Sequence, residues 1–79
     1  MPYHEITVPE LGIDDVPITV SCWLTRRGAR VSRDEPIVEI LAGAATVDLP
    51  SPAEGVLVKR LVSEDEPIQT GQALALIES

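Results

Sequence analysis

Short aliphatic runs separated by turn-forming residues repeat along the whole of this 79-residue chain. Six of them have the length of a strand and are rich in valine and isoleucine, whose β-branched side chains favour extended backbone. Proline and glycine recur between the runs too closely for a helix of ordinary length to form. The pattern therefore predicts an all-β fold, with strands at residues 6–8, 18–20, 37–41, 46–49, 55–58 and 73–77.

The most helix-like window, residues 21–27, ends at Gly28, and we interpret it as the end of a strand followed by a turn. Cys22 and Trp23 are neighbours within it. Because neighbouring strand residues point to opposite faces of a sheet, we expect one of these side chains in the core and the other partly exposed.

A four-residue unit occurs four times: a turn residue, two variable positions and an aliphatic residue. The units begin at Gly28, Asp34, Asp65 and Gly71, and an offset of 37 residues relates the first two to the last two. Each unit is expected to turn at a positive φ, which glycine adopts freely and aspartate sometimes. The aliphatic residue then enters the core. The repeat predicts one domain, residues 1–79, with two half-repeats at roughly 1–41 and 45–79 that pack face to face with pseudo-twofold symmetry.

Thirteen acidic against six basic residues give a formal net charge of −7. This charge repels a phosphate backbone and an anionic bilayer surface, so neither nucleic acid nor a membrane is an expected partner. No apolar stretch is long enough to span a bilayer, and no secretory signal is visible at the start of the chain. The single cysteine, Cys22, cannot form an intrachain disulfide, and we expect the cytoplasm or an organelle matrix as the compartment.

Carboxylates are the main candidates for chemistry, and they fall in turns at residues 14–15, 34–35 and 64–66. General acid or base catalysis needs a carboxylate held in a cleft, and so small a chain has little room for one. His4 has no partner in any recognisable motif, and no Cys/His cluster suits zinc. We therefore expect no catalytic residue and no metal ligand, and hence no enzyme activity of its own.

Several segments together resemble lipoyl and biotinyl carrier domains, and the resemblance covers nearly the whole chain. The family's fold is a flattened β-barrel, or barrel-sandwich hybrid, of two four-stranded antiparallel sheets. The lipoyl domains of 2-oxo acid dehydrogenase acyltransferase components fit best, because Ala45-Thr46-Val47 follows the hairpin tip, whereas biotin carriers usually place methionines beside their lysine. The matching segments are residues 8–12, 20–24, 37–40, 45–56 and 71–78.

The resemblance places the family's attachment site at a hairpin tip made of Leu41, Ala42, Gly43, Ala44 and Ala45. Matching the family's Asp-Lys-Ala to residues 43–45 puts Gly43 at the aspartate and Ala44 at the lysine. The family's ligase joins the lipoyl carboxyl group to a lysine amine, and alanine has no such nucleophile. We accordingly expect no cofactor on this chain.

The only lysine in the chain, Lys59, follows Gly55 in a different strand. We interpret Lys59 as a solvated residue whose stem covers apolar surface. A second departure from the family lies at Asp34 and Asp65, where it usually has glycine; a positive φ at these residues would cost about 1 kcal/mol each.

Three functions fit these features. The first is a natural, non-lipoylated binding or assembly module of an acyltransferase-like protein. The second is an authentic swinging-arm domain in which alanine was substituted for the lysine, although Gly43 also departs from the family. The third is a lipoyl-like hairpin of a transport adaptor. In the first two, the resemblance implies partners among the components of a 2-oxo acid dehydrogenase-like complex, such as a decarboxylase, and a lipoate ligase.

Overall fold

The computed structural model describes residues 2–12 and 16–79, and these residues form β-strands and turns without a helix. The all-β prediction is confirmed. Each of the six predicted runs contributes to a strand, and two further two-residue strands lie inside the four-residue units. The strands are β1 (Tyr3–Thr7), β2 (Ile18–Trp23), β3 (Arg30–Val31), β4 (Pro36–Ala42), β5 (Ala45–Pro50), β6 (Gly55–Arg60), β7 (Pro67–Ile68) and β8 (Ala73–Glu78).

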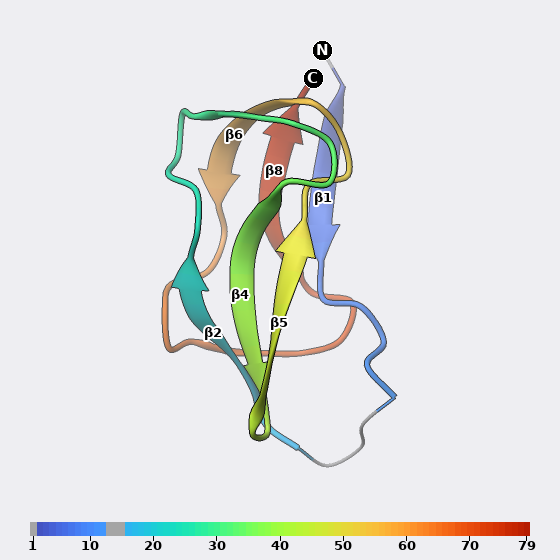
Figure 1. Ribbon diagram of the computed structural model, residues 1–79, viewed down its shortest axis with the longest axis vertical. Coiled ribbons are helices and arrows are strands. Elements are labelled where there is room, and N and C mark those ends of the chain that lie inside the picture. The colour runs from blue at the N-terminus through green and yellow to red at the C-terminus, as the bar shows by residue number, and fades with distance from the viewer. Residues whose placement is uncertain (1, 13–15) are drawn as a thin grey trace.

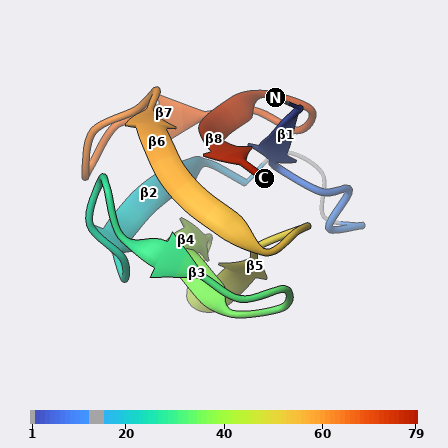
Figure 2. The ribbon, with the colours of Figure 1, turned by 90° about the horizontal axis from the view of Figure 1, so that it is seen from above.

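The strands form two four-stranded antiparallel sheets, as the resemblance implied, with the orders β1-β8-β6-β3 and β5-β4-β2-β7. Replacing each strand of one sheet by the strand four places away in the chain reproduces the other sheet, so the topology has pseudo-twofold symmetry. The molecule is elongated, with extents of 37 × 19 × 18 Å. The β4–β5 hairpin turn lies at one end of the long axis and the chain termini at the other (Figure 1). Seen along that axis, β1 and β8 lie on the side of the molecule opposite β4 and β5 (Figure 2).

The offset of 37 residues extends to the strand register. In the β2–β4 pair, Val20 lies opposite Ile40 and a bulge follows before Cys22. In the β6–β8 pair, Leu57 lies opposite Ile77 and a bulge follows before Lys59. These irregularities occur at equivalent positions, so each sheet bends at the same place.

The four repeated units turn as predicted. Gly28, Asp34, Asp65 and Gly71 have φ values of 92°, 70°, 69° and 85°. Each backbone N–H at these positions is bonded to the other half of the fold: Gly28 donates to the Leu57 carbonyl at 2.6 Å, and Asp65 donates to the equivalent Val20 carbonyl at 2.7 Å. The turns therefore join the halves as well as reverse the chain.

The aliphatic residue of each unit lies in the core, as expected, with Val31, Ile37, Ile68 and Leu74 at most 5% exposed. They join a single buried cluster with strand residues from both sheets. A different close contact occurs at Gly55, where a Cβ atom would lie 2.8 Å from the Glu78 carbonyl carbon and 3.1 Å from Ser79 Cα. A side chain at this position would therefore separate β6 from the end of β8.

The expectation for Cys22 and Trp23 is only partly correct, because both side chains are partly exposed. They do diverge: Cys22 contacts Glu39 across the β2–β4 pair, whereas Trp23 packs against the core cluster. The bulge explains the difference. It places two residues of β2, Ser21 and Cys22, against Glu39, which interrupts the simple alternation of faces.

Candidate functional site

The candidate site is the turn between β4 and β5. Ala42 and Ala45 form the last pair of the hairpin, which leaves Gly43 and Ala44 as a two-residue loop. Gly43 has φ 61°, whereas Ala44 is not among the residues with positive φ. Glycine at the first central position with a positive φ is the pattern of a type II′ turn, whose twist suits a tight hairpin. Ala44 is exposed at its end.

A neighbouring segment braces this turn. The Gly43 N–H donates to the Pro17 carbonyl at 3.2 Å. A Cβ atom on Gly43 would lie 3.6 Å from Val16 Cγ1, an ordinary van der Waals distance. The chain segment that leads into β2 therefore holds the turn from one side, and it ties the turn to the β2 end of the same sheet.

The apolar surface of the tip is smaller than its sequence suggests. Side chains alternate along β4, so Ile40 and Ala42 face the core at 0% and 3% exposure, whereas Leu41 between them is 37% exposed. Ala42 belongs to the tip by position, but its methyl group does not contribute to the surface. Leu41, Ala44 and Ala45 are the exposed apolar residues there.

The turn offers no amine for an amide bond with a carboxylated cofactor. Gly43 has no side chain and Ala44 ends in a methyl group. Neither residue has a nucleophile that could form an amide bond with a lipoyl or biotinyl group, so these residues do not fit such a cofactor. Lys59 does not replace the missing amine at the turn, since it lies on β6 opposite Leu76 of β8, in the other sheet. Its side chain is exposed, in agreement with the solvated position expected for it.

A small polar cluster lies on the outer side of β2. Glu39 Oε2 accepts hydrogen bonds from Ser21 Oγ at 2.8 Å and from Cys22 Sγ at 3.7 Å. Desolvation raises the pKa of the Cys22 thiol above its ordinary value, and the negative charges of Glu39, Glu64 and Asp48 raise that pKa further. The thiol is therefore kept neutral and is a weak nucleophile at neutral pH.

A feature that the sequence analysis did not identify lies where β2 and β6 end. The Arg60 guanidinium carbon lies 5.0 Å from the centre of the Trp23 ring, within cation–π range. The two side chains border a shallow pocket. Trp23 and Arg60 are 37 residues apart, so they occupy equivalent positions in the two half-repeats. The pocket is lined by Trp23, Arg60, Leu61, Val62, Ser63 and Glu64.

The remaining polar candidates have structural contacts. His4 Nε2 lies 3.0 Å from Ser79 Oγ, at the end that carries the termini. Glu35 and Glu66 accept hydrogen bonds from the Ser32 and Ser63 N–H groups within their own turns. Asp14 and Asp15 lie outside the described residues. Within residues 2–12 and 16–79, no three His, Cys, Asp or Glu side chains are grouped as a metal site would require, and no helix there is long and apolar enough to cross a bilayer.

Comparison with known proteins gives consistent matches. The Biotin_lipoyl family model, described as "Biotin-requiring enzyme", matches residues 4–77. The succinyltransferase component of the 2-oxoglutarate dehydrogenase complex of Bartonella vinsonii is 35% identical over 95% of this chain, and the acetyltransferase component of the pyruvate dehydrogenase complex of Mycobacterium bovis is 39% identical over 91%. The chain spans only 18% and 13% of these two relatives. The solution structure of the lipoyl domain of the 2-oxoglutarate dehydrogenase complex of Azotobacter vinelandii has the same fold, with a TM-score of 0.74 at 24% identity over 94% of this chain and 96% of that domain.

Proposed function

This chain belongs to the biotin- and lipoyl-attachment domain family, and from that membership we propose that it is a lipoyl-type domain which carries no lipoyl group and serves as a binding or assembly module. The proposed setting is an acyltransferase-like subunit of a 2-oxo acid dehydrogenase complex. A carrier domain has no catalytic site of its own; it presents a group to the active sites of other proteins. In the present chain the presenting scaffold is intact and the presented group has no attachment point.

The observation that carries the proposal is the chemistry of the Gly43–Ala44 turn. The turn has the position that presentation requires, at the end of the long axis away from the termini (Figure 1). It is also braced by Pro17 and Val16. Ala44, which we assign to the attachment position, has a methyl group in place of an amine. A fixed and exposed turn that cannot be acylated retains only contact functions.

A second departure at the tip, Gly43 in place of the family's aspartate, favours this interpretation over an authentic swinging-arm domain altered at Ala44 alone. Gly43 has φ 61° and packs beside Val16, and an aspartate at such a φ is less favourable than glycine. Glycine at residue 43 therefore suits the positive φ of this turn. The proposed partners are protein components of the complex, which meet an apolar tip formed by Leu41, Ala44 and Ala45.

Intact-mass measurement after co-expression with a lipoate ligase tests the proposal. We expect no adduct on the given chain and a lipoyl-sized mass increase on the double variant Gly43→Asp/Ala44→Lys. Lys59→Arg in the double variant is the matched control, because it removes the only other lysine and should leave the adduct in place. An adduct on the unmodified chain would contradict the proposal. Complete lipoylation of Ala44→Lys alone would instead support the authentic swinging-arm domain.

A further inference from the structure

The basic residues of the chain are confined to two segments. Residues 24–33 and 55–63 contain none of the thirteen acidic residues and all six basic ones. A chain with a net charge of −7 therefore has two segments that are purely positive. The six residues are exposed; they are Arg26, Arg27, Arg30, Arg33, Lys59 and Arg60.

The fold brings the two segments together. The pairing of β3 with β6 continues past the end of β3, because the Leu57 N–H donates to the Ala29 carbonyl at 3.0 Å. Further along, Arg60 Nη2 donates to the Thr25 carbonyl at 2.8 Å. The turn between β2 and β3 is thus held against the last residues of β6, and cations of both segments share one surface. We call the following five residues the basic surface: Arg26, Arg27, Arg30, Lys59 and Arg60.

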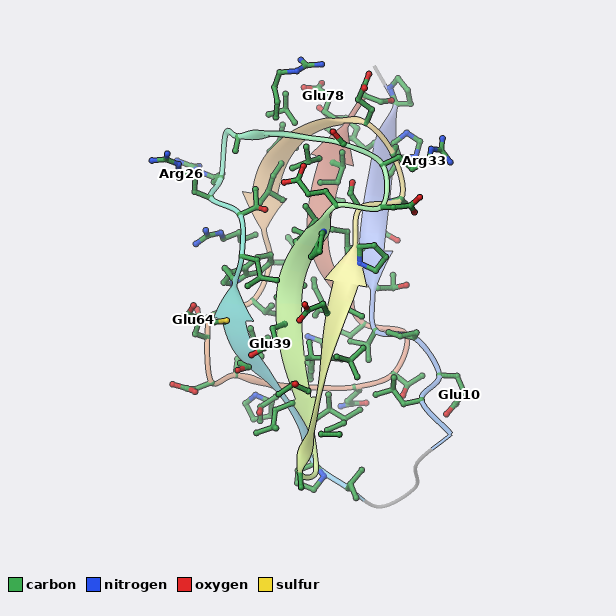
Figure 3. The ribbon with its side chains drawn as sticks, viewed as in Figure 1. Glu10, Arg26, Arg33, Glu39, Glu64 and Glu78 are labelled. Carbon is green, nitrogen blue, oxygen red and sulfur yellow. The ribbon has the colours of Figure 1, made fainter. Side chains whose placement is uncertain are left out.

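The basic surface is separate from the hairpin tip. Its two segments lie in the half of the molecule that carries the termini, away from the β4–β5 turn (Figure 1). Figure 3 shows Arg26 and Arg33 in that half, whereas Glu39 and Glu64 lie nearer the hairpin. Arg33 is left out of the basic surface, because acids follow it at residues 34–35.

Acidic residues border the basic surface but do not bond to it. Glu54 precedes β6, and Glu78 lies opposite Val56, one strand further from Arg30. Within residues 2–12 and 16–79, Arg60 is the only one of the five cations whose side chain donates a hydrogen bond to the protein, and its acceptor is a carbonyl. The cationic groups of the other four are therefore available to anions from outside.

We propose that the basic surface binds an acidic segment of another polypeptide. Guanidinium groups pair with carboxylates through two parallel hydrogen bonds, a geometry that lysine does not match, and four of the five cations are arginines. Arginines fixed on adjoining backbone segments can meet successive carboxylates of an extended chain. Because the surrounding charge is negative, only an anion short enough to stay within the five cations avoids repulsion.

A long polyanion fits this surface less well. Nucleic acid or an anionic bilayer would extend beyond the five cations and meet Glu54 and Glu78, on a chain whose net charge is −7. The proposal goes beyond the proposed function and does not depend on it. It gives the module a second contact surface, of polar chemistry, in addition to the apolar tip at the other end of the molecule.

Fluorescence anisotropy tests the inference with a labelled, capped peptide in which glutamates alternate with serines. A peptide with glutamine in place of every glutamate is the matched probe. We expect saturable binding of the glutamate peptide at low salt and at least about fivefold weaker binding of the glutamine peptide. The affinity for the glutamate peptide should fall as the salt concentration rises, because the contacts are exposed.

Variants locate the binding. Arg26→Gln/Arg27→Gln/Arg30→Gln should weaken binding of the glutamate peptide about tenfold, because three exposed charge pairs are lost. Arg60 stays unchanged in this variant, since it also lies over the Trp23 ring. Arg27→Gln alone is a milder variant and should weaken the same peptide about twofold. It keeps the test decisive if the triple variant fails to fold, which circular dichroism shows.

A charge-matched variant separates the surface from the net charge. It lowers the net charge by the same three units at exposed residues outside the basic surface, and it should change the affinity by less than about twofold. The substitutions are Thr46→Glu, Gln69→Glu and Thr70→Glu.

Equal binding of the two peptides would overturn the inference, as would equal losses in the triple variant and its charge-matched control. Tighter binding of a DNA oligonucleotide or of phosphatidylserine vesicles than of the glutamate peptide, lost in the triple variant, would overturn it in favour of a polyanion. Sedimentation that shows self-association, again lost in the triple variant, would overturn it in favour of a second copy of the chain. Lipoylation of the unmodified chain would contradict the proposed function and leave the peptide titration unaffected.

Discussion

Trp23 and Arg60 form equivalent hydrogen bonds to opposite halves of the fold. Trp23 Nε1 donates to the Val62 carbonyl at 3.2 Å, and Arg60 Nη2 donates to the Thr25 carbonyl at 2.8 Å. Both donors and both acceptors are related by the same 37-residue offset, so the pair lies across the pseudo-twofold axis. An aromatic and a cationic side chain thus occupy equivalent positions. The contact between the Trp23 ring and the Arg60 guanidinium connects the two residues that donate these hydrogen bonds.

The first prediction concerns this pair. Arg60→Ala should lower the free energy of unfolding by about 1–2 kcal/mol, through loss of the cation–π contact and of the bond to Thr25. In a double-mutant cycle with Trp23→Leu, the coupling energy should be about 0.5–1 kcal/mol. Urea denaturation provides the measurement. Arg33→Ala, at an exposed arginine elsewhere, should change stability by less than about 0.5 kcal/mol; a coupling energy near zero would show that the two side chains are neighbours without stabilising each other.

The second prediction concerns the strained aspartates. Asp34 and Asp65 have φ values of 70° and 69°, and replacing either with glycine should raise the free energy of unfolding by up to about 1 kcal/mol. The gains should add in the double variant, because the residues lie in separate turns. Asp48→Gly, within strand β5, is the control and should destabilise. Matched denaturant melts that show no gain would mean that these turns are not strained.

Gly55 gives the third prediction. A methyl group there would collide with the Glu78 carbonyl, so Gly55→Ala should cost about 3 kcal/mol or more and disrupt the pairing of β6 with β8. Gly71→Ala is the matched control. Gly71 has φ 85° with open space around its Cβ direction, so only backbone strain of about 1 kcal/mol is expected. Thermal melts compare the two, and equal losses would contradict the steric argument.

The fourth prediction follows from the raised pKa of Cys22. The pKa of the Cys22 thiol has its ordinary value of 9.0 in the unfolded chain and is higher in the folded chain. Between those values the folded state binds more protons at this thiol, so the contribution of Cys22 to stability is constant below about pH 9 and is lost as the pH rises further. Alkylation by iodoacetamide should be slower in the folded chain than in urea at pH 8.5. Glu39→Gln should speed the folded reaction by removing the nearest charge; Glu54→Gln should not.

Much of the fold could be predicted from the chain. The spacing of Gly28, Asp34, Asp65 and Gly71 predicted both the positive φ values and the pseudo-twofold relation, because each turn requires a residue that tolerates the left-handed region. What could not be predicted was set by contacts between strands. The bulge at Ser21, which turns Cys22 toward Glu39, depends on how β2 pairs with β4. No local pattern near Ser21 indicates it.

The candidate site divides in the same way. Because side chains alternate along a strand, the sequence could have predicted that Ala42 is buried on the same face as Ile40. The exposed apolar residues of the tip could then have been predicted as Leu41, Ala44 and Ala45. The pocket beside Trp23 could not be predicted from the sequence, because Arg60, which also lines it, comes from the other half of the chain. The assignment of Ala44 to the attachment position, and the absence of a cofactor there, stay predictions.

The meeting of the two chain ends has an architectural consequence. Ser79 donates its N–H to the Pro2 carbonyl at 3.2 Å, and Tyr3 pairs with Glu78. Under the pseudo-twofold relation, this pairing of β8 with β1 is the counterpart of the β4–β5 hairpin. The termini therefore stand where a second hairpin turn would be. A circular permutant could join Ser79 to Pro2 through a short loop and begin at Ala44. It would have a hairpin turn where the termini now lie and its termini at the present β4–β5 turn, and it would keep every strand pairing.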